Sequence, residues 1–155
     1  MKDLLDEISR VHHPYPPVSP DEISAFEAAM GWRLDDELRA FYLHCNGACL
    51  FGQAPDWSYR ILPLSEIRRA RIAVFGQRGD TDERGPASWY VVCDNGDGDY
   101  VAIDTSALQG GRYPLFDVWH EAFPRQEDCR QVASSFAEFL ARALRSEGFR
   151  YWLSV

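Results

Sequence analysis

A glycine- and aspartate-rich turn between two apolar segments constrains the fold of this chain more than any other feature. Residues 89–93 and 99–104 are rich in β-branched and aromatic side chains, and residues 94–98 read Asp-Asn-Gly-Asp-Gly. Asn-Gly and Asp-Gly pairs accept the positive φ angles that a tight turn between antiparallel strands requires. The sequence therefore predicts a β-hairpin, and it does not predict a fold made of repeated parallel β-α-β units.

The first third of the chain is predicted to be mainly helical. Residues 3–11 place their apolar side chains on one helical stripe, and the three prolines within residues 12–18 favour an extended connector. Residues 19–31 open with Ser-Pro-Asp-Glu, which combines a capping box with a proline at the first helical position, and they end in a glycine. Residues 35–47 form the next predicted helix, which opens on two aspartates and ends at Asn-Gly.

The rest of the chain is predicted to consist mainly of strands before a final helix. The predicted segments are a loop at 48–57, a strand at 59–62, a helix that Ser65 caps and that reaches Val74, a mobile surface loop at 76–87, a strand at 113–118, and a helix from Ser135 to Gly148. Helices followed by mainly antiparallel strands and a closing helix indicate the α+β class. With 155 residues, the chain is expected to form one domain, residues 1–155.

The acidic charge of the chain restricts its partners. The formal net charge is −8, and the excess of acidic residues lies in residues 1–59 and 88–117. A general nucleic-acid binder normally carries a basic patch, and anionic membranes attract basic segments, so we expect neither nucleic acid nor a membrane as partner. A basic protein partner is compatible with this charge, because a strongly signed field steers association.

The distribution of apolar residues predicts where in the cell the protein resides. The N-terminus carries acidic residues where a signal peptide needs an apolar stretch, and the longest apolar run is residues 89–93, so we expect a cytoplasmic protein.

The four cysteines lack Cys-x-x-Cys spacing and are too sparse for a disulfide scaffold. We interpret them as ordinary thiols.

Motifs for catalysis or metal binding are incomplete. His120-Glu121 begins like a zinc-binding His-Glu-x-x-His helix, but position 124 is proline. The acidic turn fails as a calcium loop, because positions 96 and 98 are glycine. Cys45 adjoins His44, but neighbours on a helix point about 100° apart and form no dyad. We therefore predict no enzyme, no catalytic residue, no metal ligand and no cofactor.

Five residues are candidates for contact with a protein partner. Asp94, Asp97 and Asp99 lie within six residues, on a turn that we expect to project into solvent. Trp57 follows Asp56 in a predicted loop, and an exposed tryptophan beside acids suits an interface anchor. The alternatives are that the acids only promote solubility and that Trp57 packs beneath its own loop.

The order of several motifs resembles the SUKH superfamily, of the cell-wall-assembly-regulator (Smi/Knr) type. The motifs are Pro16-Pro17-Val18-Ser19-Pro20-Asp21-Glu22-Ile23, Phe26-Glu27, Gly31-Trp32-Arg33-Leu34, Phe41-Tyr42, Asn46-Gly47, Ile61-Leu62-Pro63-Leu64-Ser65-Glu66-Ile67, the hairpin of residues 94–104 and the closing helix of residues 135–144. The resemblance spans residues 16–147. Two positions depart from the family pattern, since Asp35 replaces its usual proline and Ala48 replaces its second glycine.

The resemblance implies both a fold and a function. It implies an α+β fold with a mixed or mainly antiparallel sheet flanked by helices. It also implies an immunity protein that binds and neutralises a bacterial polymorphic toxin, which is expected to be basic and is often a nuclease in this branch. The family has no shared catalytic residues. A non-enzymatic scaffold or regulatory module and a small enzyme are the alternatives, and the oligomeric state stays open.

Overall fold

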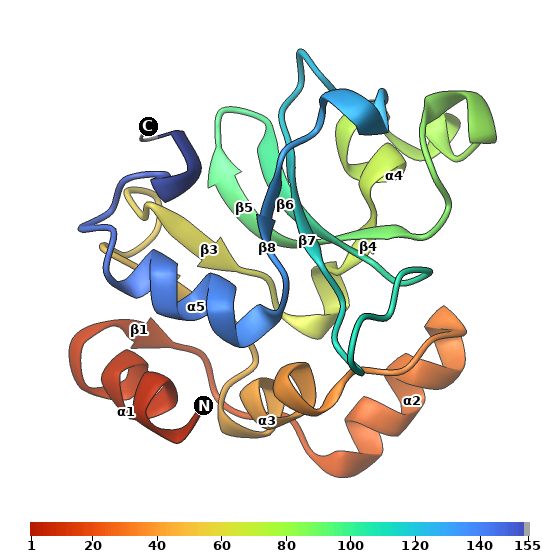
Figure 1. Ribbon diagram of the computed structural model, residues 1–155. Helices are drawn as coiled ribbons and strands as arrows, with labels where there is room; N and C mark the ends of the chain where they lie inside the picture. The colour runs from red at the N-terminus through yellow and green to blue at the C-terminus, as the bar shows by residue number, and fades with distance from the viewer. Residues whose placement is uncertain (154–155) are drawn as a thin grey trace.

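The computed structural model describes residues 1–153, and it combines helices with one sheet (Figure 1). The helices are α1 (Lys2–Val11), α2 (Pro20–Met30), α3 (Asp36–His44), α4 (Ala70–Phe75) and α5 (Phe136–Leu144). The strands are β1 (His13–Pro14), β2 (Ala48–Leu50), β3 (Tyr59–Ile61), β4 (Arg68–Arg69), β5 (Trp89–Gly96), β6 (Asp99–Asp104), β7 (Leu115–Val118) and β8 (Gln131–Ala133). Short 3₁₀ turns are η1 (Leu64–Glu66), η2 (Gln77–Gly79), η3 (Asp82–Arg84), η4 (Gln126–Asp128) and η5 (Tyr151–Leu153).

The strands form one antiparallel sheet. Its order is β1-β2-β3-β5-β6-β7-β8, and β4 pairs with β5 beside this path. Each pairing between these strands is antiparallel. The predicted α+β class and the mainly antiparallel sheet are therefore confirmed, and the β5–β6 hairpin lies at the centre of the sheet.

Both faces of the sheet are covered. Side chains alternate between faces along a strand, and a β-bulge between Val91 and Cys93 shifts this alternation in β5. Tyr59 lies on the face that α5 covers, where its ring centroid is 6.1 Å from that of Phe139. Trp89 lies on the opposite face and stacks on Phe116 with the ring centroids 4.7 Å apart. Figure 1 shows α5 across the sheet near β3 and α4 beyond β4.

Ser19, Asp35 and Ser135 cap α2, α3 and α5, with one difference from the prediction at α5. Ser19 forms the full capping box with Glu22, and Gly31 ends α2 with a φ of 79°. Asp35 accepts a hydrogen bond from the Leu38 amide and so caps α3, the helix that was predicted to open on two aspartates. Ser135 also accepts from the backbone of its helix, but the Glu138 carboxylate binds Ser134 instead of completing the box.

Several short elements differ from the prediction. Residues 48–50, predicted as loop, form β2, and β1 and β8 were not predicted. Ser65 caps no helix, because η1 and then β4 occupy the start of that segment and α4 begins only at Ala70. In each case the segment pairs with a distant strand over two or three residues, which is too short to show a sequence period.

The segment 76–87 is held by ion pairs. It contains η2 and η3, and the buried guanidinium of Arg71 donates to Asp80 at 2.8 Å and to Asp82 at 2.9 Å. Arg71 also donates to the carbonyl of Gly85. The charged residues that suggested a surface loop therefore include two that fasten this loop to α4.

Candidate protein-binding surface

Strand register brings four separate segments to one end of the sheet. Arg60 pairs with Asp94, so the loop before β3 lies beside the β5–β6 turn. Val118 pairs with Tyr100, so the residues after β7 emerge at the same end. The Arg150 guanidinium donates to the carbonyls of Asn95 and Gly96, which adds the C-terminal segment. We call this surface the hairpin end; it comprises residues 51–58, 94–99, 119–121 and 147–153 (Figure 1).

The structure places four of the five predicted contact residues at accessible positions of the hairpin end. Asp56 and Asp97 are exposed, whereas Trp57 and Asp94 are partly buried. Asp94 also accepts a hydrogen bond of 2.7 Å from the Gly96 amide, which shapes the turn. No ion pair within residues 1–153 involves Asp56, Asp94 or Asp97. These carboxylates are therefore free to attract a basic partner.

Asp99 is buried, so the expectation that the turn projects it into solvent is wrong. Only 4% of its surface is exposed. It begins β6 and points to the face opposite that of Asp94, because Asp94 is paired with the next residue, Tyr100. One carboxylate oxygen accepts from the backbone amide of His120 at 3.1 Å and lies 2.8 Å from Nδ1 of its ring. The other oxygen accepts from Arg150 at 2.9 Å.

These contacts decide the ionisation of the buried acids. Burial opposes the charge of Asp99, but the hydrogen bonds from His120 and Arg150 outweigh it and lower the pKa of Asp99. The same hydrogen bond to Asp99 raises the pKa of His120. At Asp117, on β7, burial and the nearby negative charge of Asp99 prevail over the opposing effects of Trp152, Arg150 and Arg130 and raise the pKa to about 6. The charged form is thus stabilised at Asp99 and destabilised at Asp117.

Sequence reasoning missed three exposed apolar side chains at the hairpin end. Phe149 is 70% exposed, Leu153 61% and Trp119 45%. None of the three lies in a segment whose apolar and polar residues follow a helix or strand period, so the sequence pattern does not mark it as exposed. Arg150, the partner of Asp99, was missed because 51 residues separate the two.

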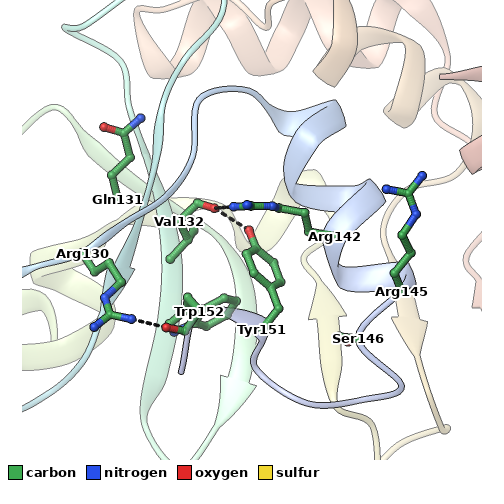
Figure 2. Close-up of a pocket in the computed structure, with 8 residues that line it drawn as sticks. All are labelled: Arg130, Gln131, Val132, Arg142, Arg145, Ser146, Tyr151 and Trp152. Carbon is green, nitrogen blue, oxygen red and sulfur yellow. Dashed lines mark hydrogen bonds between the residues drawn. The ribbon is translucent and has the colours of Figure 1, made fainter. Parts of the chain in front are cut away.

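A basic pocket lies beside the hairpin end, between β8, α5 and η5 (Figure 2). Its volume is about 450 Å³, and its lining residues are Arg130, Gln131, Val132, Arg142, Arg145, Ser146, Tyr151 and Trp152. The Val132 carbonyl accepts from the Tyr151 hydroxyl at 2.7 Å and from Arg142. The Arg130 guanidinium donates to the carbonyl of Trp152. The lining contains no carboxylate, imidazole or thiol, so it offers binding groups rather than an acid–base pair.

The thiols lie in the interior of the protein. All four cysteines are free and buried. Burial raises the pKa of Cys45 to about 12 and that of Cys129 to about 11, so both stay protonated near neutral pH. Within residues 1–153, no three His, Cys, Asp or Glu side chains are grouped so that they could hold a metal ion. Over the same residues, every helix is too short or too polar to cross a membrane.

The structure thus combines an α+β fold, exposed acids at the hairpin end and buried thiols. The chain belongs to the SMI1/KNR4 family (SUKH-1), whose model matches residues 17–142. It is similar to the immunity protein YokJ of Bacillus subtilis (strain 168), with 29% identity over 122 residues, which cover 78% of this chain and 71% of that protein. The family and this relative support an immunity function in general and a non-enzymatic role.

Proposed function

We propose that this protein is an immunity protein that binds a cognate toxin directly and neutralises it. The hairpin end is the binding surface, with Asp56, Trp57, Asp94 and Asp97 on the side that faces the toxin. Asp99 acts from inside, where it positions the turn. The partner is a protein with a basic surface, as a nuclease toxin would have, and neutralisation takes place in the cytoplasm of the cell that makes the toxin.

The observation that carries this proposal is the placement of the unpaired acids. Asp56 and Asp97 come from different loops, yet both are exposed at one end of the sheet and neither takes part in an ion pair within residues 1–153. Exposed acids without an ion-pair partner attract a basic protein and speed its association. The immunity-protein relative supports the same assignment.

Co-expression tests the function itself. Each open reading frame beside the gene for this chain is expressed alone and together with it, and cell survival is measured. We expect one neighbour to be lethal alone and tolerated with this chain, and we expect the two purified proteins to form a complex. If no lethal neighbour is rescued, the immunity proposal is wrong and a regulatory binding role becomes the better interpretation.

Variants that remove carboxylate charges at the hairpin end, compared with matched variants elsewhere, test whether this surface binds the toxin. The double variant Asp56→Asn, Asp97→Asn removes two charges at the hairpin end, and Glu7→Gln, Glu83→Gln removes two at other sites. Association with a catalytically inactive form of the rescued toxin is measured by stopped flow at several salt concentrations. We expect the first variant to slow association roughly three- to tenfold and to reduce its salt dependence, and the second to change it by less than about twofold. Equal effects of both variants would mean that the net charge of the protein, and not the hairpin end, attracts the toxin.

A further inference from the structure

Exposed apolar side chains are concentrated at the hairpin end. Phe149, Leu153 and Trp119 are the three that lie there, and they come from two segments about 30 residues apart in sequence. A single exposed apolar residue is ordinary in a soluble protein. Several of them on one surface, beside charged groups, are typical of an interaction site.

Two of these side chains are held on anchored backbone. Asp99 binds His120 with one oxygen and Arg150 with the other, and the residues that precede these two partners are Trp119 and Phe149. The Tyr59 hydroxyl also donates to the carbonyl of Phe149. The Trp119 carbonyl accepts from two backbone amides, those of residues 122 and 123, each at 2.9 Å. Because both segments are fixed before binding, a partner that contacts them pays little to order the backbone.

The charges around these aromatic rings indicate what kind of partner they fit. Glu121 lies two residues after Trp119, and Glu147 lies two residues before Phe149. Asp97 lies in the neighbouring turn between β5 and β6, and all three acids are exposed. None of the three takes part in an ion pair within the described part of the chain. Aromatic faces beside carboxylates suit arginine and lysine side chains, which stack on the ring and pair with the acid.

We propose that Trp119 and Phe149, held on either side of the buried Asp99, are the apolar anchors that bind an arginine- or lysine-rich surface of the cognate toxin. This inference rests on the proposed function and adds residues to it. The acids bring the basic partner in, and the two rings supply the contacts that keep it bound, since buried aromatic side chains dominate the binding energy of most interfaces. Neither anchor lines the basic pocket of Figure 2, although Tyr151 and Trp152 of the hairpin end do.

The chain offers matched controls for this proposal. Leu108 is 59% exposed and lies after β6, at the opposite end of the sheet, and Val11 is exposed on α1. The variants Trp119→Ala and Phe149→Ala are compared with Leu108→Ala and Val11→Ala in binding to the inactive form of the rescued toxin. We expect the two anchor variants to raise Kd roughly 10- to 100-fold, mainly through faster dissociation, and the controls to change it less than about threefold.

A second measurement is independent of truncation. A photoreactive benzoylphenylalanine is placed at position 149, and at position 108 as control. We expect the first to crosslink to the toxin and the second to remain uncrosslinked. Normal binding by both anchor variants, or crosslinking from position 108 alone, would overturn the inference while leaving the immunity function in place. If the unmodified protein itself fails to bind the rescued toxin, the proposed function fails instead.

Discussion

Replacing Arg150 with methionine removes one partner of a buried carboxylate while keeping most of the volume of the side chain. In the native protein Arg150 donates to Asp99 at 2.9 Å and to the carbonyls of Asn95 and Gly96. The side chain of Asp99 is only 6% exposed. The variant therefore leaves a charged group in the interior with His120 as its remaining side-chain partner.

The expected cost follows from this geometry. Removing one partner of a buried ion pair typically costs about 3–5 kcal/mol. The His120 amide and ring still bind Asp99, and Arg150 is itself 23% exposed, so we expect a loss below this range, about 2–3 kcal/mol. Asp99→Asn should cost less, about 1–2 kcal/mol, because it leaves a charge that reaches solvent. In a double-mutant cycle, the two residues should show a coupling energy of about 1.5 kcal/mol.

The pH dependence identifies the buried charge as the cause. In the native protein the pKa of Asp99 lies below its unfolded value, so its stabilising effect is present above that value and is lost as pH falls through the lowered pKa. In Arg150→Met, burial is no longer outweighed and the pKa of Asp99 should rise. The cost of the substitution should then shrink between pH 7 and pH 4, because the carboxyl can become neutral.

Urea unfolding followed by tryptophan fluorescence at pH 7.5 and pH 4.5 measures these free energies. Arg125→Met is the matched control, because Arg125 is 63% exposed and pairs with Asp128 only at the surface. We expect that control to cost less than about 0.5 kcal/mol at both pH values. A loss below about 1 kcal/mol for Arg150→Met, or one that does not change with pH, would refute the reasoning that Asp99 depends on this partner.

Three further predictions test other parts of the structure. The folded pKa of Asp117 is raised to about 6 from its ordinary value of 3.8, so the penalty on the native state grows as pH rises between these two values and is complete above about pH 6. Asp117→Asn should therefore stabilise the protein by about 1–2 kcal/mol at pH 8, after solvent screening, and by progressively less toward pH 4, as thermal unfolding at each pH will measure. Arg142→Glu with Arg145→Glu reverses the charge of two pocket residues that do not belong to the hairpin end. We expect toxin affinity to stay within about threefold, as titration calorimetry will measure. Gly47→Ala should lower the free energy of urea unfolding by more than about 3 kcal/mol, because an added Cβ would lie 2.5 Å from the Ile61 carbonyl oxygen. Gly96→Ala is the control, because open space surrounds that position, and it should lower the free energy by only about 1 kcal/mol.

Local chemistry explains which elements could be predicted from the sequence. The caps of α2 and α3 depend on residues three positions apart, and the hairpin turn depends on glycines that tolerate positive φ. Each signal lies entirely within its own segment. β1, β2, β4 and β8 have at most three residues each, and they are strands only because a neighbour supplies their hydrogen bonds. Nothing within such a segment distinguishes it from a loop.

The candidate surface was predictable in part for the same reason. Asp56 and Asp97 lie in loops with strong turn signals, and both are exposed. The position of Asp99 depends on where β6 begins and on a guanidinium 51 residues later in the chain. The bulge in β5 also shifts the alternation, and no local signal marks it. Charge counted along the sequence therefore overstates the charge that the hairpin presents.

This difference changes how binding should work at the hairpin end. If all three hairpin aspartates faced solvent, electrostatic attraction could account for both the rate and the strength of binding. Because Asp99 is buried and paired with Arg150, fewer carboxylates remain to attract a partner. Exposed charge pairs each contribute only about 0–1 kcal/mol. A tight complex then requires apolar contacts, which we propose come from Trp119 and Phe149. The buried Asp99 binds His120 and Arg150, the residues that directly follow these two. Neutralising the exposed acids should therefore alter mainly the association rate, whereas truncating the two rings should alter mainly the dissociation rate.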